Sequence, residues 1–157
     1  DSNDLLYVAG DEIIHAIDVP ATLTNGAPAF AWQTDLTEDV TGAGTGNAGA
    51  DPLVADNGVV YIATASGTVL GLSQSDGSFI GSNTVSQSPI AATPTRAGDR
   101  LIVGTQDGSV AVLNDTTLGV VDSVSAGVPI LAEPVVQNGV IYYGTTDGSV
   151  VAVNNIP

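Results

Sequence analysis

The feature that most constrains this chain is a segment that recurs about every forty residues. Its last copy, Pro134–Asn154, reads P-V-V-Q-N-G-V-I-Y-Y-G-T-T-D-G-S-V-V-A-V-N. Earlier copies begin at Pro52 and Pro94, and a degenerate copy opens the chain near Leu5. A period of this length, with several short strands in each unit, is typical of the blades of a β-propeller. We therefore predict an all-β protein, a β-propeller of about four four-stranded blades.

Two glycine-containing dipeptides predict where the last unit turns. Asn138-Gly139 and Asp147-Gly148 favour positive φ at both central positions, which a two-residue hairpin requires. The strands beside these turns, Val140–Tyr143 and Val150–Val153, are apolar at every position. A strand without polar alternation is typical of a sheet that is covered on both faces. Each unit is therefore expected to be a small sheet held between two other units.

Counting strands suggests that the propeller is open. The units lie at about 1–36, 52–82, 92–125 and 132–157, with an irregular loop over 37–51. The first unit is expected to form strands Leu5–Val8, Ile13–Ile17 and Phe30–Thr34, with a loop over Pro20–Pro28. The four units then hold three, four, four and three strands. We expect the first and last blades to be incomplete and to be completed by a neighbouring subunit, because open edges and apolar faces favour pairing with another chain.

Two motifs show a resemblance to a known family. The string Gly-Thr-x-Asp-Gly-Ser-Val, which begins at Gly104 and again at Gly144, resembles the repeat of quinoprotein-type (PQQ-like) β-propellers. Ala16-Ile17-Asp18, followed by Gly26 and Trp32, is similar to that family's A-[LI]-D-x-x-T-G-x-x-x-W motif, with Val19–Asn25 as an insertion. The resemblance covers nearly the whole chain and implies that Trp32 docks between neighbouring blades. The family includes quinone-dependent dehydrogenases and non-catalytic scaffolds, notably an outer-membrane assembly lipoprotein.

The residue content disfavours the enzymatic members of that family. A quinone enzyme requires a bound cation, a basic residue near the cofactor and stacking aromatics, whereas the only cationic side chains are Arg96 and Arg100 and there is one tryptophan. His15 is the only histidine, and a catalytic histidine needs a positioned partner, so we interpret it as a strand residue between blades. We predict a non-enzymatic protein with no catalytic residue and no bound cofactor. A fragment of a quinone-dependent dehydrogenase is the less favoured alternative.

The charge balance excludes some partners. Seventeen acidic residues give a formal net charge of −15, which repels nucleic acid and anionic lipid. No apolar run approaches the roughly 20 residues that span a bilayer. The chain lacks cysteine and lysine, carries few charges and is rich in Ser, Thr, Gly and Val, as suits an extracellular β protein. We therefore predict a secreted or cell-surface location for the mature chain after signal removal.

Short motifs outside the strands have plainer explanations. Gly44–Gly49 reads G-x-G-x-x-G, but no helical pattern follows it to hold a pyrophosphate, so it predicts no nucleotide site. Glu38, Asp39 and Asp51 are weak candidates for a calcium site, since hard cations take carboxylate oxygens. Asp107 and Asp147 occupy the same turn in successive units and are interpreted as turn formers. Asn114-Asp115-Thr116 is a glycosylation sequon, with Asn114 as the candidate acceptor.

The incomplete blades favour self-assembly as the function. Two chains would close an eight-bladed ring, or head-to-tail contacts would build a filament, since heterologous contacts that do not close propagate. The alternative is a monomeric scaffold, resembling the outer-membrane assembly propellers, that binds other surface proteins through loops such as 37–51. The residues expected to make the assembly contacts are Leu5, Leu6, Tyr7, Val8, Val150, Val151, Val153 and Ile156.

Overall fold

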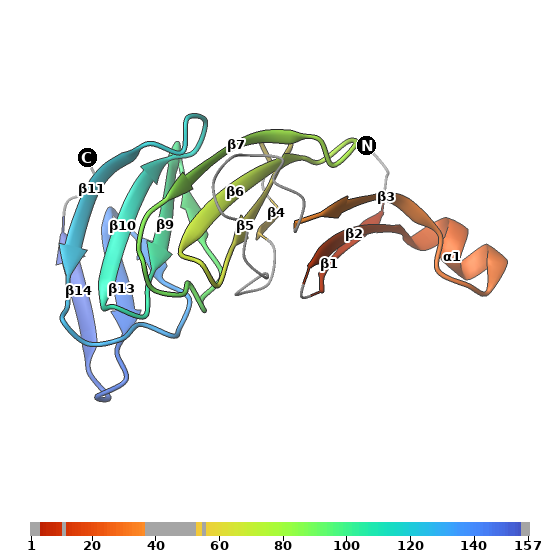
Figure 1. Ribbon diagram of the computed structural model, residues 1–157. Helices are drawn as coiled ribbons and strands as arrows, with labels where there is room; N and C mark the ends of the chain where they lie inside the picture. Colours follow the sequence, from red (N-terminus) through yellow and green to blue (C-terminus); the bar gives the residue numbers. More distant parts are fainter. Residues whose placement is uncertain (1–3, 11, 37–52, 55, 155–157) are drawn as a thin grey trace.

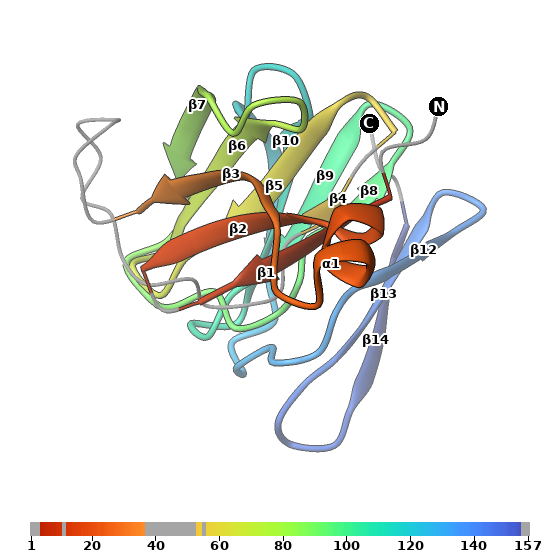
Figure 2. The ribbon, with the colours of Figure 1, turned by 90° about the vertical axis from the view of Figure 1, so that its right-hand side faces the viewer.

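Four small antiparallel sheets stand side by side in a row, with the N-terminal and C-terminal sheets at its ends (Figure 1). This computed structural model describes residues 4–10, 12–36, 53–54 and 56–154 of the chain. In that part of the chain the row does not close into a ring. Figure 2 views the row from its N-terminal end, where the first sheet lies in front of the others. The predicted all-β, propeller-type fold is confirmed.

Within each sheet, the strands follow one another in sequence order. The first sheet contains β1 (Leu5–Ala9), β2 (Ile13–Asp18) and β3 (Phe30–Asp35). The second contains β4 (Leu53–Val54), β5 (Val59–Ala63), β6 (Thr68–Ser73) and β7 (Phe79–Thr84). The third contains β8 (Thr95–Ala97), β9 (Arg100–Gly104), β10 (Ser109–Asn114) and β11 (Val120–Ser125). The fourth contains β12 (Val135–Gln137), β13 (Val140–Gly144) and β14 (Val150–Asn154).

A helix, α1 (Val19–Asn25), connects β2 to β3, so the prediction of a loop over Pro20–Pro28 is wrong. The Oδ1 atom of Asp18 accepts a hydrogen bond from the Ala21 N–H at 2.8 Å and caps the N-terminus. Pro20 lies in the first turn, where its missing N–H costs nothing, and Gly26 ends the helix with a φ of 67°. Figure 1 shows α1 at the far end of the row, beyond the first sheet.

The two predicted hairpins of the fourth sheet have different geometries. Asn138 and Gly139 have φ values of 53° and 76°, which confirms a two-residue turn. In the second hairpin only Gly148 has a positive φ, so the prediction for Asp147-Gly148 is wrong. The Thr145 N–H donates to the Ser149 carbonyl, which leaves a three-residue loop. Asp147 still shapes this turn, because its Oδ1 accepts from the Thr145 hydroxyl at 2.7 Å and from the Ser149 N–H at 3.0 Å.

The core consists of three apolar clusters, one in each gap between neighbouring sheets. Every cluster combines side chains from the second and third strands of both sheets. Strands β5 and β6 are buried on both faces, as the sequence predicts for a unit between two others. The first gap holds Ile14, Ala16, Trp32, Val60 and Ile62, the second holds Tyr61, Ala63, Leu101 and Val103, and the third holds Ile102, Val110, Ile141 and Tyr143.

The fourth sheet is covered on one face only, which corrects the prediction for its apolar strands. Val151 and Val153 pack against the third sheet, whereas Val150 is 79% exposed. The same alternation leaves Tyr142 exposed between the buried Ile141 and Tyr143. The apolar sequence of these strands is that of an interior sheet, so its second face presents apolar side chains to solvent.

Candidate binding surfaces between and at the ends of the sheets

A tyrosine recurs at one position of the repeat in three of the four sheets, where it lies on β1, β5 and β13. Tyr7 pairs with Ala16, and Tyr61 pairs with Gly71, each of which directly precedes the bulge in its sheet. Tyr142 occupies the same position in the fourth sheet and pairs with Ala152. The third sheet has Ile102 there instead. Tyr7, Tyr61 and Tyr142 are therefore equivalent residues of the repeat, each opposite a small residue.

Two of these tyrosines donate a hydrogen bond to the following sheet. The Tyr61 hydroxyl donates to the backbone carbonyl of Asp115 at 2.7 Å, and the Tyr7 hydroxyl donates to the carbonyl of Gln74 at 3.3 Å. Gln74 and Asp115 each directly follow the third strand of their own sheet. Burial raises the pKa of both phenols above the ordinary value, so they remain protonated donors at neutral pH. A tyrosine thus ties one sheet to a fixed point of the next.

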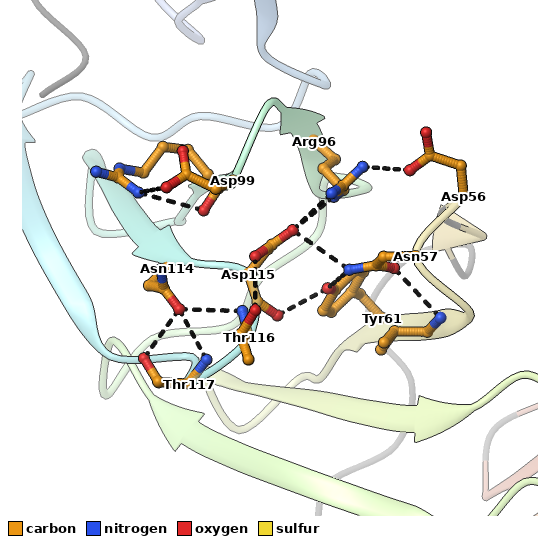
Figure 3. A network of polar contacts seen from close by, with 11 residues as sticks. Asp56, Asn57, Tyr61, Arg96, Asp99, Asn114, Asp115, Thr116 and Thr117 are labelled. Carbon is orange, nitrogen blue, oxygen red and sulfur yellow. Dashed lines mark hydrogen bonds and ion pairs between the residues drawn. The ribbon is translucent and has the colours of Figure 1, made fainter.

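An ion-pair network surrounds the Tyr61 contact (Figure 3). The Asp115 side chain is only 5% exposed, and its Oδ2 atom accepts from the Arg96 Nε–H at 2.8 Å. Arg96 also pairs with the exposed carboxylate of Asp56, and its hydrogen bond to Asp115 raises the pKa of the guanidinium. Asn57 donates from its Nδ2 to the Tyr61 hydroxyl at 2.8 Å. Because a buried carboxylate must be paired, these contacts fix the second sheet against the third.

A leucine fills the space beside the small residue in this gap. Leu118 follows Asp115 by three residues, has a φ of 56° and is 2% exposed. Its Cδ1 lies 3.7 Å from the position that a Cβ of Gly71 would take. The Asn83 side chain donates to the Leu118 carbonyl at 2.7 Å and holds the loop in place. Leu118 from the next sheet therefore packs over Gly71, at ordinary contact distance from where a methyl group would stand.

Trp32 has the same role in the first gap, as the family resemblance implies. Its ring is buried, and its Nε1–H donates to the Gln74 carbonyl at 3.0 Å. Gly77 lies against this ring with a φ of 72°, and a Cβ there would be 2.5 Å from the indole. The docking of Trp32 thus depends on a glycine in the loop of the second sheet.

Asp107 joins the second and third sheets by a second polar contact. Its Oδ2 atom accepts from the Ser86 hydroxyl at 2.7 Å, and its Oδ1 accepts from the Thr105 hydroxyl and from the Ser109 N–H. These hydrogen bonds, with that of Thr105 the largest, hold the pKa of Asp107 below its ordinary value. Asp107 is therefore a turn former, as predicted, and also a link to Ser86 that the sequence did not indicate.

The outward face of the fourth sheet, here called the open C-terminal face, consists of Val135, Tyr142, Val150 and Ala152. Tyr142 is 40% exposed, whereas its equivalent Tyr61 is fully buried. Val150 is 79% exposed, whereas its equivalent Val69 is fully buried. No other segment that the structure describes covers these side chains. This face therefore has the apolar composition of a buried contact between two sheets, although it is exposed to solvent.

The outward face of the first sheet, the open N-terminal face, consists of Leu6, Val8, Ile17 and Phe30 around His15. The register places His15 opposite Val8, and its ring lies 5.2 Å from that of Phe30. Its Nδ1 atom is buried and has no hydrogen-bond partner among the described residues. His15 therefore lies on an end face of the row. The sequence had predicted a position between two sheets, and among the described sheets that prediction is wrong.

In the structure, the described residues that were predicted to make assembly contacts fall into an exposed group and an inward-facing group. Leu6, Val8 and Val150 are exposed on the two open faces. The other described members instead pack inward against a neighbouring sheet, because side chains alternate between the two faces of a strand. These inward residues are Leu5, Tyr7, Val151 and Val153. Ile156 lies outside the described residues.

The other predicted sites receive no support as ligand sites. Glu38, Asp39 and Asp51, like the Gly44–Gly49 string, lie outside the described residues. Within the described ranges, no three His, Cys, Asp or Glu side chains are grouped to hold a metal ion. The Asn114 Oδ1 accepts from the Thr117 N–H at 2.9 Å and shapes the loop, whereas its glycosylation stays a prediction. No helix in the described segments is long and apolar enough to cross a membrane.

Sequence reasoning missed Asp115 and the tyrosine contacts. The sequence shows Asp115 only as the middle residue of a sequon, and no neighbouring residue indicates that it is buried. The tyrosines do carry a signal, because each ends an apolar triplet: Leu5-Leu6-Tyr7, Val59-Val60-Tyr61 and Val140-Ile141-Tyr142. Their acceptors could not be found in this way, since these are backbone carbonyls in the next unit.

Small antiparallel sheets that stack face to face and are joined by repeated contacts define this chain as a β-propeller-type repeat protein. The family model described as outer membrane protein assembly factor BamB matches residues 10–156, so the chain belongs to this family of PQQ-like repeat proteins. No curated protein matches the sequence.

Two solved structures resemble the fold. BamB from Moraxella catarrhalis is 19% identical with a TM-score of 0.72; the match covers 98% of this chain and 45% of that one. The computationally designed Ika4 protein is 15% identical with a TM-score of 0.77, and the match covers 98% of this chain and 87% of that one. At these identities the likeness establishes the fold, and the chain spans less than half the length of that BamB.

Proposed function

We propose that this chain is a non-enzymatic, protein-binding scaffold of the cell envelope. The family to which it belongs is described as an outer membrane protein assembly factor, which supports both a protein-binding role and an envelope location. The single observation that carries the proposal is the open C-terminal face. Its exposed apolar side chains stand in the register by which the interior sheets bind one another.

The polar residues in the described segments support a structural rather than a catalytic role. Asp107 and Asp115 are each engaged by hydrogen bonds or ion pairs that hold the sheets together. A general base needs a positioned partner, whereas His15 lies beside Phe30 and its buried Nδ1 atom has no hydrogen-bond partner among the described residues. The hydrogen bonds and ion pairs of Asp107 and Asp115 hold neighbouring sheets together, as expected for a scaffold.

Site-specific photocrosslinking tests the proposal. A photoreactive residue replaces Tyr142 in one variant and Val121 in a matched control; Val121 is an exposed apolar residue of β11 outside the open C-terminal face. Each variant is incubated with an envelope extract of the cells that make the protein. We expect one protein to crosslink at position 142, with excess unlabelled chain competing for it, and not at position 121. Equal crosslinking at both positions, or none at 142, would overturn the proposal.

A second candidate function, self-assembly into an oligomer or filament, is favoured by one further observation. Leu6, Val8 and Ile17 of the open N-terminal face stand at the positions of Leu101, Val103 and Leu113, which pack against the second sheet. One molecule therefore carries two apolar faces of the kind that meet in its own gaps. Head-to-tail association of such faces propagates unless the geometry closes it.

Light scattering over a range of concentrations tests self-assembly. We expect an assembling chain to lose its oligomers when Leu6 or Val150 is replaced by Asp, since a charge cannot be buried in the apolar gap. The matched control is Val121→Asp, which places the same charge outside both faces. A wild-type chain that stays monomeric at all concentrations excludes this candidate and leaves the scaffold proposal intact.

A further inference from the structure

We propose that Asn57 is a site of spontaneous deamidation, and that its conversion to aspartate or isoaspartate releases the contact between the second and third sheets. Asn57 lies in the turn that precedes β5 and is followed by Gly58. Its side chain belongs to the polar network of Figure 3. This site is separate from the open faces on which the proposed function rests, so either proposal can fail without the other.

The sequence Asn57-Gly58 supplies both reacting groups. The backbone nitrogen of Gly58 attacks the side-chain amide carbon of Asn57. A C–N bond forms to close a succinimide ring, and the amide nitrogen takes up the proton of the attacking N–H and leaves as ammonia. Water then opens the ring at one or the other carbonyl carbon and gives aspartate or isoaspartate. Glycine favours the first step, because it has no Cβ to hinder the approach of the two groups.

The structure leaves this amide accessible and orients it. Asn57 and Gly58 are both exposed, and a Cβ on Gly58 would have no atom within 4 Å, so no described residue crowds the attacking nitrogen. The Asn57 Oδ1 atom accepts a hydrogen bond from the Val59 N–H at 3.3 Å. That hydrogen bond polarises the carbonyl group that is attacked, so the turn favours the reaction.

The amide nitrogen of Asn57 is engaged in the contact between the sheets. Its Nδ2 atom donates to the Tyr61 hydroxyl at 2.8 Å and to the Oδ2 atom of Asp115 at 3.3 Å. The Tyr61 hydroxyl uses its only proton on the Asp115 carbonyl, so it needs a donor such as Asn57 for its own oxygen. An intact contact therefore holds the nitrogen that has to leave, and it slows the reaction.

Deamidation changes both of these contacts from attractive to repulsive. A carboxylate at position 57 has no N–H to donate, and its oxygen atoms would face the Tyr61 hydroxyl oxygen and the Asp115 carboxylate. Aspartate and isoaspartate both carry this charge. Because the Asp115 side chain is buried, a second carboxylate beside it disfavours the folded arrangement.

The positive charge of the network does not offset the new carboxylate. Arg96 already pairs with Asp115 and with the exposed Asp56. Arg100, the only other arginine in a chain without lysine, pairs with Asp99. The product would therefore be a third carboxylate around one guanidinium. The loss of ammonia makes the reaction irreversible, so the contact stays weakened once it has occurred.

Two other asparagines of the described segments precede a glycine but make no such contact. Asn25-Gly26 ends α1, and Asn138-Gly139 forms the first turn of the fourth sheet. Both side chains are exposed, and neither forms a hydrogen bond with another described residue. Deamidation there adds a charge at the surface without disturbing a contact between sheets. Asn138 is therefore the matched control for Asn57.

Asn57→Asp reproduces the aspartate product, and urea unfolding measures its effect. We expect the unfolding equilibrium to shift towards the unfolded state by roughly 5- to 30-fold, and by less than about twofold for Asn138→Asp. Asn57→Ala removes the amide without adding a charge, and its shift should lie between these two. This variant carries the comparison if Asn57→Asp does not fold. Equal shifts for substitutions at positions 57 and 138 would overturn the inference.

Incubation of the full chain in warm, mildly alkaline buffer tests the reaction itself. Peptide mapping by mass spectrometry follows each asparagine. We expect Asn57 to deamidate, and to do so roughly fivefold faster in Tyr61→Phe, because one hydrogen bond to its amide is lost. Tyr142→Phe should leave the rate at Asn57 unchanged, and the rate at Asn138 should be the same in all three proteins. The inference is wrong if Asn57 stays intact in the folded protein but reacts in the urea-unfolded chain.

Replacement of the attacking residue separates modification of Asn57 from other effects of ageing. Gly58 and Gly139 both have a positive φ and open space at the Cβ position, so Gly58→Ala and Gly139→Ala are a matched pair. Aged wild type and aged Gly139→Ala should lose stability as Asn57→Asp does. Aged Gly58→Ala should keep its starting stability, because the added methyl group hinders the attack. A loss in aged Gly58→Ala equal to that of the wild type would assign the change to another residue.

Discussion

The hydroxyl of Tyr61 donates a hydrogen bond to the backbone carbonyl of Asp115, 2.7 Å away, across the gap between the second and third sheets. Tyr7 repeats this relationship with Gln74 in the first gap. Apolar packing alone tolerates small slips between two sheets, whereas a buried donor and acceptor must be satisfied. The recurring tyrosine therefore sets the register in which one sheet stacks on the next.

Tyr61→Phe should destabilise the protein by about 2 kcal/mol, because the Asp115 carbonyl and the Asn57 amide lose their buried partner. Urea unfolding followed by circular dichroism measures the change. Tyr142→Phe is the matched control, since it removes the same atom from an exposed ring, and it should change the free energy of unfolding by less than about 0.5 kcal/mol. Equal costs for the two variants would contradict a role for the hydroxyl in joining the sheets.

Arg96→Ala should cost about 3 kcal/mol, because it leaves the buried Asp115 carboxylate without its cation. Asp56→Asn removes the other partner of the same guanidinium, but Asp56 is 88% exposed, so this variant should cost less than about 1 kcal/mol. Both values come from urea unfolding at neutral pH. A cost for Asp56→Asn that matches that for Arg96→Ala would show that the exposed pair, not Asp115, supplies the stabilisation.

The stability of the protein should fall with acid partly through Asp107. Hydrogen bonds from Thr105 and Ser86 hold the folded-state pKa of Asp107 below its ordinary value. A depressed pKa stabilises the folded state above the unfolded value of about 3.9, and this stabilisation is lost as the pH falls through the folded-state pKa. Ser86→Ala removes one donor, so the pKa of Asp107 should rise towards its unfolded value.

Urea unfolding between about pH 5 and pH 2 measures this effect. We expect a shallower loss of stability with falling pH in Ser86→Ala than in the wild type. Ser123→Ala, which replaces an exposed serine of β11, should keep the wild-type slope. An unchanged slope in Ser86→Ala would mean that its hydrogen bond does not depress the pKa of Asp107.

Gly108→Ala should cost more than Gly148→Ala, although both glycines have a positive φ. The left-handed backbone alone costs a non-glycine residue about 1 kcal/mol. At Gly108 the added methyl group would also lie 2.5 Å from the Val128 nitrogen, whereas at Gly148 it would meet open space. We expect about 1 kcal/mol for Gly148→Ala and above about 3 kcal/mol for Gly108→Ala, measured by thermal and urea unfolding. Similar costs at the two sites would show that the backbone conformation alone decides them.

Local patterns in the sequence predict much of this architecture. The forty-residue period, the apolar triplets and turn dipeptides such as Asn138-Gly139 indicate strands and their order, because these depend on neighbouring residues. The helix α1 also has local signals in Asp18, Pro20 and Gly26, but a mixture of Pro, Thr, Asn and Gly is typical of a loop, which is why the sequence predicts one there. The Asp147 turn differs because its side chain closes a three-residue loop, which the dipeptide alone does not reveal.

The sequence by itself determined that this protein is a repeat of small sheets with apolar strands, since hydrophobic periodicity and turn chemistry are written in adjacent residues. Only the tertiary structure decided that Tyr61 meets Asp115, that Leu118 fills the space over Gly71, and that Val151 faces inward while Val150 faces solvent. These contacts are made between residues of different repeat units, so they depend on which sheets are neighbours in the fold. A strand that is apolar on both sides does not say whether its second face is covered; the stacking of the sheets decides it.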